Sequence, residues 1–176
     1  MCPTYRRATI RDVEAIAGLH ADSWRRHYRG AYLDAFLDGD ILADRLAVWT
    51  HRLTAHRADD RTIVAELDGA VVGFAHTTLR DDPTWGALLD NLHVTHGLKG
   101  HRIGTALMVE TAGAVLDAGP EGLYLWVLEQ NTAAQAFYEA RGGACVGRKL
   151  GGPFPGGGRA ITLRYAWTDP PRLLDP

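Results

Sequence analysis

Two successive strand-to-helix transitions in the second half of the chain are the feature that most restricts its fold. Residues 85–94 and 123–128 form short apolar runs typical of strands. Residues 103–118 and 133–141, which follow them, carry apolar side chains at the three- and four-residue spacing of a helix. A succession of strand, helix, strand and helix predicts an α/β domain, in which helices flank a sheet.

The remaining segments extend this pattern toward both ends. A strand is predicted over 5–10, a helix over 12–28, and a second helical stretch, broken near Gly39, over 32–56. A hairpin is predicted over 62–79 around the two-residue turn Asp68-Gly69. Two further strands are predicted over 144–150 and 159–167, joined by a glycine-rich segment that we expect to be a mobile connection.

The length of the chain sets the number of domains. It has 176 residues, of which 46% are apolar, which is enough for a single core. We expect one domain over residues 1–168 and a Pro-rich tail over 169–176 without a packing pattern. Almost all basic residues are arginine, and Ala and Gly are abundant, a bias that favours a GC-rich bacterial source.

Charge and hydropathy exclude several classes of protein. A net charge of -2 provides no strong basic field for nucleic acid. The longest nearly uncharged apolar stretch, 103–116, is shorter than the roughly 20 residues needed to cross a bilayer. Residues 1–20 contain no apolar segment of a secretory signal, so we expect a cytoplasmic protein. The two cysteines, Cys2 and Cys145, make neither a disulfide framework nor a metal site.

The start of the helix near Arg102 is a candidate anion site. The preceding residues, 97–101, contain no Ser, Thr, Asp or Asn that could cap the helix. Its first N–H groups are therefore expected to lack a local partner, with Lys99 and Arg102 beside them and Gly100 and Gly104 permitting close approach. This arrangement suits phosphate oxygens. A solvated loop with a glycine turn is the alternative interpretation.

The second transition, over 125–138, carries further candidates. Thr132 and Gln135 have the spacing of a capping box, which would leave the amide of Asn131 free to face a ligand. Tyr138 lies at the edge of the predicted buried stripe, so its hydroxyl is expected to reach a cleft. The alternative is an ordinary helix start with a half-buried core tyrosine.

The two segments together resemble the GNAT superfamily of acetyl-coenzyme A dependent N-acyltransferases. The pattern is a strand, a (Gln/Arg)-x-x-Gly-x-(Gly/Ala) loop, a helix, a strand, and then Asn followed by Phe-Tyr six and seven residues later. Here the loop is Lys99 to Gly104, and the later part is Asn131 with Phe137 and Tyr138. The resemblance covers nearly the whole chain. It implies a mixed, mostly antiparallel sheet of about seven strands, splayed at the fourth and fifth.

The resemblance also implies the site. Acetyl-coenzyme A is the implied cosubstrate, with no metal. A primary amine would attack its thioester directly in a ternary complex and take the acetyl group. Tyr138 is the implied general acid for the leaving thiolate. The implied cofactor-binding residues are Leu92, His93, Val94, Lys99, Gly100, His101, Arg102, Ile103, Gly104, Thr105, Asn131, Ala134, Phe137 and Tyr138.

The chain departs from the family pattern at three places. Lys99 replaces the usual Arg or Gln, Arg102 stands where the first motif glycine is expected, and Leu88 occupies the strand position where many members place a catalytic Glu. The general base is therefore open between Glu129, His93 and a bare water chain, with Asp90 as a further candidate. A coenzyme A binding module that has lost catalysis is the rival function.

The acceptor is the least defined part of the prediction. Trp24, His27, Tyr28 and Tyr32 could line its pocket, although aromatic residues at helical spacing can equally belong to the core. The expected acceptor is a small-molecule amine or a peptide N-terminus. A homodimer is compatible with the family, and the preferred acyl chain is open.

Overall fold

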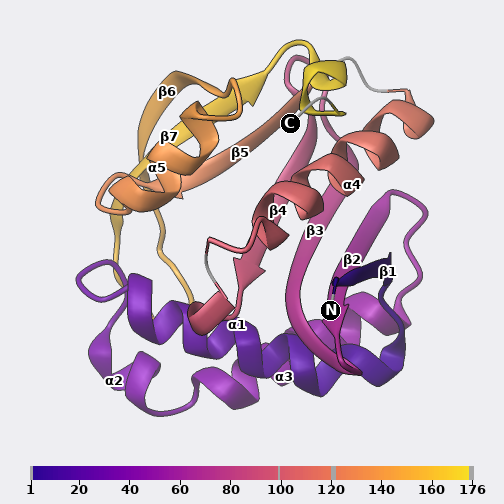
Figure 1. The fold of residues 1–176 in the computed structure, drawn as a ribbon. Helices are drawn as coiled ribbons and strands as arrows, with labels where there is room; N and C mark the ends of the chain where they lie inside the picture. Colours follow the sequence, from indigo (N-terminus) through magenta and orange to yellow (C-terminus); the bar gives the residue numbers. More distant parts are fainter. Residues whose placement is uncertain (1, 99, 120–121, 175–176) are drawn as a thin grey trace.

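Seven strands form one sheet in the computed structural model, which describes residues 2–98, 100–119 and 122–174 (Figure 1). The strands are β1 (Thr4–Arg7), β2 (Asp60–Leu67), β3 (Ala70–Asp82), β4 (Gly86–Val94), β5 (Leu123–Leu128), β6 (Ala144–Gly151) and β7 (Ala160–Trp167). The helices are α1 (Val13–His27), α2 (Asp34–Asp38), α3 (Ile41–Thr54), α4 (Ile103–Ala118) and α5 (Thr132–Glu139), with short 3₁₀ turns η1 (Ile10–Asp12), η2 (His96–Leu98) and η3 (Pro170–Leu174). The predicted element order and the break near Gly39 are confirmed.

The strands lie in the order β1-β2-β3-β4-β5-β7-β6. All neighbours are antiparallel except β4 and β5, which are parallel. The predicted hairpin turn has the backbone that its residues favour, since Asp68 and Gly69 have φ of 53° and 80°. The mixed, mostly antiparallel sheet is thus confirmed.

Helices cover both faces of the sheet, α1 and α3 on one face and α4 on the other. Ile16 of α1 and Trp49 of α3 pack with Val64 and Phe74, which are directly opposite each other on β2 and β3. On the other face, α4 packs its Leu107 and neighbouring apolar residues on the sheet. Because successive strand residues point to opposite faces, one hairpin supplies both layers of the core. Among the described residues, no helix is long and apolar enough to span a bilayer.

The parallel strands β4 and β5 separate soon after they meet. Among the described residues they pair only at Ala87 with Leu123 and at Leu88 with Tyr124. A register shift between β3 and β4 leaves Asp90 as an extra residue on β4, and such a bulge bends the strand that carries it. The predicted splay of the fourth and fifth strands is therefore present.

The C-terminal segment differs from expectation. Instead of an unpacked tail, residues 170–174 form η3, and Leu173 is buried in the same core cluster as α4. The prolines favour this compact turn, but the anchoring contact comes from a leucine that no periodic pattern identifies.

The glycine-rich segment 151–158 also packs more closely than a loose connection. Phe154 stacks on Tyr32 with ring centroids 4.7 Å apart. Gly158 has a positive φ, and a Cβ there would lie 2.4 Å from the carbonyl oxygen of Ala31. This segment therefore fits against the chain between α1 and α2, and glycine is required for the fit.

Candidate active site

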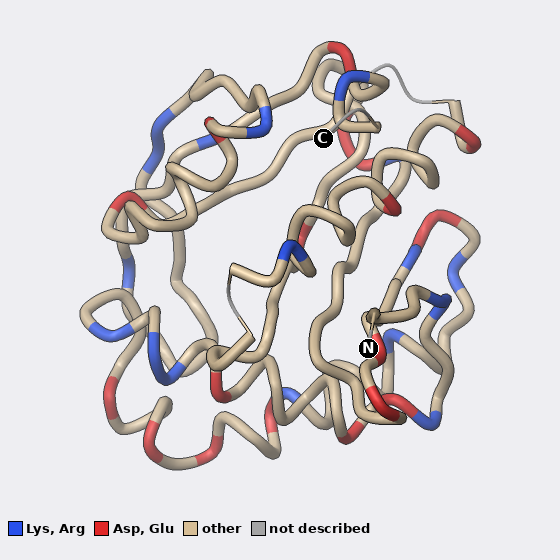
Figure 2. Tube along the Cα trace, viewed as in Figure 1, with Lys and Arg blue, Asp and Glu red and all other residues tan. Residues whose placement is uncertain are grey.

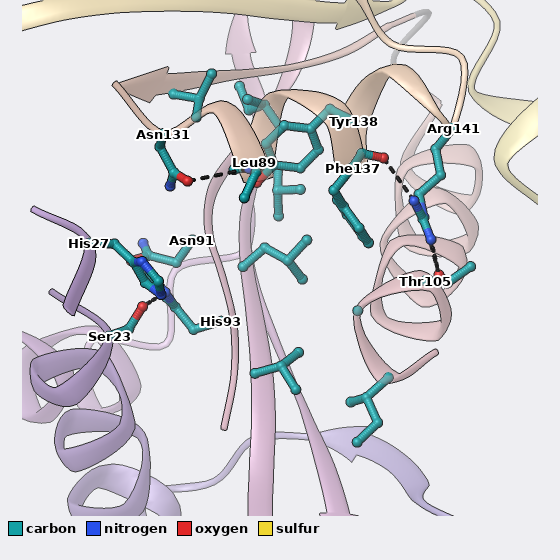
Figure 3. A pocket seen from close by; sticks show the side chains of 18 of the residues that line it. Ser23, His27, Leu89, Asn91, His93, Thr105, Asn131, Phe137, Tyr138 and Arg141 are labelled. Atoms are coloured by element: carbon teal, nitrogen blue, oxygen red, sulfur yellow. Dashed lines mark hydrogen bonds between the residues drawn. The ribbon is translucent and has the colours of Figure 1, made fainter. Parts of the chain in front are cut away.

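A cavity of about 360 Å³ occupies the space where β4 and β5 part. Its walls come from α1, both parting strands, the start of α4 and helix α5 (Figure 3). The lining residues include Ser23, His27, Tyr28, residues 89–94, Leu98, Gly100, residues 102–105, residues 125–127, Asn131, Ala133, Ala134, Phe137, Tyr138 and Arg141. Almost all residues that the sequence assigns to the cofactor therefore lie on one cavity. Lys99 is outside the described residues, and the exposed His101 does not line the cavity.

The first turn of α4 lies on the wall of this cavity. Arg102 occupies the N-cap position with φ of 60° and makes no capping hydrogen bond through its side chain. That left-handed backbone is the conformation that glycine adopts most easily, which explains why the family motif has glycine here. An uncapped 16-residue helix presents positive partial charge, so this wall suits phosphate groups.

Gly104 keeps this wall open. A Cβ at position 104 would lie 3.3 Å from the Cζ atom of Phe137 on α5. The absence of a side chain lets α4 and α5 approach each other beside the cavity. A larger residue would have to displace the Phe137 ring or intrude on the ligand space.

Arg141 is a lining residue that sequence reasoning missed. Its guanidinium donates to the Phe137 carbonyl at 2.8 Å and to the Thr105 hydroxyl, and lies 3.7 Å from the centroid of the Phe137 ring (Figure 3). Burial, and secondly the charge of Arg102, lower the pKa of Arg141. The only signal in the sequence was its position four residues after Phe137, on the same helical face.

The start of α5 corrects the predicted capping box. Asn131 is the N-cap, and its side chain accepts a hydrogen bond from the amide of Ala134 at 3.3 Å. The Asn131 amide donates to the Leu128 carbonyl at 2.9 Å, so it is not free to face a ligand. Gln135 donates to the carbonyls of Leu128 and Glu129 instead of accepting from the helix start. Asparagine can cap a helix alone, which the spacing of Thr132 and Gln135 concealed.

Tyr138 is buried on the cavity wall, with its ring near those of Phe137, Tyr165 and Trp167. Desolvation, and secondly the nearby Tyr28, raise the pKa of Tyr138 above that of an ordinary tyrosine. The hydroxyl therefore keeps its proton at neutral pH and can donate a hydrogen bond to an anion in the cavity.

His93 lies on the opposite wall. Its Nδ1 atom is 2.8 Å from the Ser23 hydroxyl of α1 (Figure 3). The centroid of its ring lies 4.7 Å from that of the His20 ring. Trp49 donates to Nδ1 of His20 at 3.0 Å. Burial, and secondly the charge of His93, lower the pKa of His20 well below its ordinary value. His20 is thus a neutral support behind His93.

The residues predicted to bind the acceptor divide into two groups. His27 and Tyr28 line the cavity. Trp24 and Tyr32 are buried in an apolar cluster with α2 and do not line it, as the core interpretation requires. Burial raises the pKa of Tyr28 to about 12, so this second tyrosine on the wall also stays protonated.

Comparison with known proteins identifies the family. The model described as "Acetyltransferase (GNAT) family" matches residues 15–143, which is most of the chain. The chain belongs to the GNAT acetyltransferase family. It is 25% identical over 139 residues to an uncharacterised N-acetyltransferase, YuaI, of Bacillus subtilis (strain 168). The matched region covers 78% of each protein.

Solved GNAT structures share the fold. The PaiA N-acetyltransferase of Thermoplasma acidophilum, solved in complex with coenzyme A, superimposes with a TM-score of 0.74, at 19% identity, over 95% of this chain and 100% of its own. The ribosomal-protein-alanine N-acetyltransferase of Brucella melitensis superimposes with a TM-score of 0.68, at 20% identity, over 93% and 98% of the two chains. These similarities support a common fold.

The GNAT assignment makes the position of each carboxylate informative. Leu88 is at the last paired position before β4 leaves β5. Glu129 does not line the cavity, and its exposed carboxylate is paired with Arg148 through hydrogen bonds of 2.8 and 3.0 Å, which lower its pKa. Asp90 does line the cavity but is 2.7 Å from the guanidinium of Arg52.

Charge is unevenly distributed on this GNAT fold. Acidic residues gather along α2 and the start of α3, whereas the basic Arg102 lies directly before α4 at the cleft and Arg148 and Lys149 lie on β6 (Figure 2). Among the described residues, no group of three or more His, Cys, Asp or Glu is arranged to hold a metal ion. Cys2 and Cys145 are both exposed and neither lines the cavity.

Proposed function

We propose that this protein is an N-acetyltransferase that transfers an acetyl group from acetyl-coenzyme A to a primary amine by direct attack in a ternary complex. The observation that carries the proposal is that one cavity has Tyr138 on one wall and His93 on the other. Its phosphate-binding wall would be the first turn of α4 with Arg102 and Arg141. Acetyl-coenzyme A, when bound, supplies a thioester carbonyl that an unprotonated amine can attack.

The residues at the cleft fit the shape of this cofactor. The β4 segment Leu92 to Val94 lines the cavity beyond the point where β5 has left it, so its backbone can accompany an extended arm. Asn131 and Ala134 face it from the start of α5. An uncapped helix at one end and a widening gap between strands at the other suit a ligand with phosphates and a long thin tail.

Tyr138 would stabilise the departing thiolate. A thiol has a pKa near 8.5 and an ordinary tyrosine a pKa near 10, so complete proton transfer from Tyr138 to the thiolate is unfavourable. The raised pKa of Tyr138 makes this transfer still less favourable. We therefore assign Tyr138 hydrogen-bond donation to the thiolate as the bond to the acetyl group breaks. The proton released by the amine balances the reaction.

His93 would serve as the base. An alkyl ammonium of pKa about 10.4 is neutral in only ~1 in 2,500 molecules at pH 7, which is roughly 4.6 kcal/mol for deprotonation to cover. Of the two leading candidates, only His93 reaches the cavity, while Glu129 is exposed and paired with Arg148. Ser23 orients the His93 ring, and a water molecule can complete the path to the amine.

The test combines binding, turnover and pH. Calorimetry should detect acetyl-coenzyme A binding, and thiol release should appear with a mixture of primary amines. The acidic limb of the kcat/KM profile should disappear in His93→Gln and remain in the control Glu129→Gln. Binding without thiol release for any amine would favour the alternative, a non-catalytic acyl-coenzyme A binding module. An unchanged acidic limb in His93→Gln would remove the base assignment.

Direct attack also requires that no cysteine carries the acetyl group. The exposed positions of Cys2 and Cys145 outside the cavity support this part of the proposal. The double variant with Ala at both positions should retain turnover, and loss of turnover in a folded double variant would refute direct attack.

A further inference from the structure

Two cations converge on one indole ring at the edge of the cavity. The guanidinium of Arg164 lies 4.5 Å from the Trp126 ring centroid, 4.7 Å from that of Trp85 and 5.5 Å from that of Tyr124. The Nζ atom of Lys149 lies 3.7 Å from the same Trp126 ring. Aromatic faces attract cations, so the rings hold both charges in defined places.

Strand register places these residues on one face of the sheet. Trp126 on β5 is directly opposite Arg164 on β7, and Lys149 on β6 is opposite Thr162, two residues from Arg164. The alternate β5 residues, including Leu125, face the core that packs against α5. Lys149 is exposed and Arg164 is half-buried, so this cluster is open to solvent.

Neither cation has a carboxylate partner among the described residues. The Nε atom of Arg164 is buried without a hydrogen-bond partner in the described part of the chain. Arg148 offers a contrast, because it is adjacent in sequence, lies on the opposite face and is paired with Glu129 by two hydrogen bonds. Two neighbouring positive charges without a counter-charge attract an anion from solution.

The cluster is continuous with the candidate active site through Trp126. This residue lines the cavity together with Leu125 and Val127, where β5 has parted from β4. Directly opposite residues on neighbouring strands are about 5 Å apart, so Arg164 lies within a few bond lengths of the cavity wall. A molecule with its amine in the cavity can therefore extend an anionic group to Arg164 and Lys149.

We infer that Arg164 and Lys149 form an anion subsite for the acceptor, and that the acceptor is a primary amine bearing a carboxylate. The inference rests on the proposed function, whose acceptor it specifies. Trp126 would form the floor between the amine and the carboxylate. Polyamines are disfavoured, because Arg164 and Lys149 would repel their second ammonium group.

Matched acceptors test the subsite. A panel of α- and ω-amino carboxylates, such as 4-aminobutanoate, is compared with the corresponding carboxamides at equal concentrations of unprotonated amine. For the best pair, the carboxylate should have a kcat/KM about ten-fold or more above that of its carboxamide, as expected for a charge-assisted contact. Equal kcat/KM values for every pair, in a protein that releases thiol, would overturn the inference and leave the proposed function standing.

Variants locate the effect. Lys149→Gln and Arg164→Gln should each reduce the preference for the carboxylate, with little change for the carboxamide. Arg148→Gln is the matched control and should keep the full preference. Because Lys149 is exposed, Lys149→Gln is expected to fold and tests the subsite even where Arg164→Gln does not fold. A preference that survives in Lys149→Gln and in folded Arg164→Gln would refute the subsite.

A binding measurement separates this inference from the proposed function. The dissociation constants of 4-aminobutanoate and 4-aminobutanamide are measured by calorimetry in the presence of coenzyme A, without turnover. Tighter binding of the carboxylate that is lost in Lys149→Gln supports the subsite even where no thiol is released, in which case the acetyltransferase proposal alone fails. Equal binding of both compounds counts against the subsite.

Discussion

Replacement of Arg102 by glycine should change stability and cofactor affinity in opposite directions. Arg102 has φ of 60° and ψ of 7° at the N-cap of α4, a backbone that side chains with a Cβ adopt at a cost. Its side chain also lines the cavity, and its charge contributes to lowering the pKa of Arg141. The same side chain is thus unfavourable for the folded backbone and favourable for an anionic ligand.

The magnitudes follow from these two roles. Relief of the left-handed conformation is worth about 1–2 kcal/mol, and the greater freedom of glycine in the unfolded chain removes about 0.5–1 kcal/mol of that gain. Arg102→Gly should therefore increase the free energy of unfolding by roughly 0.5–1 kcal/mol. Loss of a charge-assisted hydrogen bond, worth about 1.5–3 kcal/mol, should raise the dissociation constant for coenzyme A at least ten-fold.

Urea unfolding without ligand measures the first effect, and calorimetry with coenzyme A measures the second. Arg102→Ala is the matched control, because alanine removes the charge but keeps the Cβ. It should lose the same affinity and gain no stability. If Gly and Ala variants unfold at the same urea concentration, the backbone argument is wrong, and an unchanged dissociation constant in both would show that Arg102 does not contact the ligand.

Three further predictions follow from the site and the core. Tyr138→Phe should lower kcat by about 10²-fold, the effect of removing one preorganised hydrogen-bond donor to a developing anion, with unchanged coenzyme A affinity by calorimetry; an unaltered kcat would exclude the role. Gly104→Asp should weaken coenzyme A binding more than about ten-fold, because it adds a negative charge at the phosphate wall and crowds Phe137, whereas equal binding would place the phosphates elsewhere. Burial lowers the pKa of His76 to about 4 and holds that of His20 well below its ordinary value, so the unfolded chain binds more protons below pH 6.5 and stability should fall as the pH is lowered from about 6.5 to 4. Urea unfolding at pH 7.5 and 5 tests this, and equal midpoints would contradict it.

The sequence was informative where backbone geometry is local. Asp68-Gly69 predicted its turn, and the lack of a capping residue before Arg102 predicted an open helix start. These features depend on a few adjacent residues, so pattern alone is sufficient. The family resemblance supplied the strand splay, which no single segment of this chain specifies.

The sequence failed where distant segments meet. One error was local: Asn131, rather than a Thr132–Gln135 box, caps α5, and Gln135 donates to the carbonyls of Leu128 and Glu129. Arg141 joins the cavity only because α4 brings Thr105 to it. The position of Arg164 beside Trp126 depends on strand register between β5 and β7, which is fixed by packing rather than by local pattern.

The short contact between β4 and β5 also divides the sheet into two parts whose strands pair only at one end of the cavity. Only two residue pairs connect the strands among the described residues, and beyond Leu88 and Tyr124 the two parts are held apart across the cavity. A ligand that contacts both walls would link the two parts of the sheet and would slow amide hydrogen exchange in both of them. The stability of this protein in the cell would then depend on the ligand concentration. At low ligand concentration the protein would open locally more often and be degraded more easily.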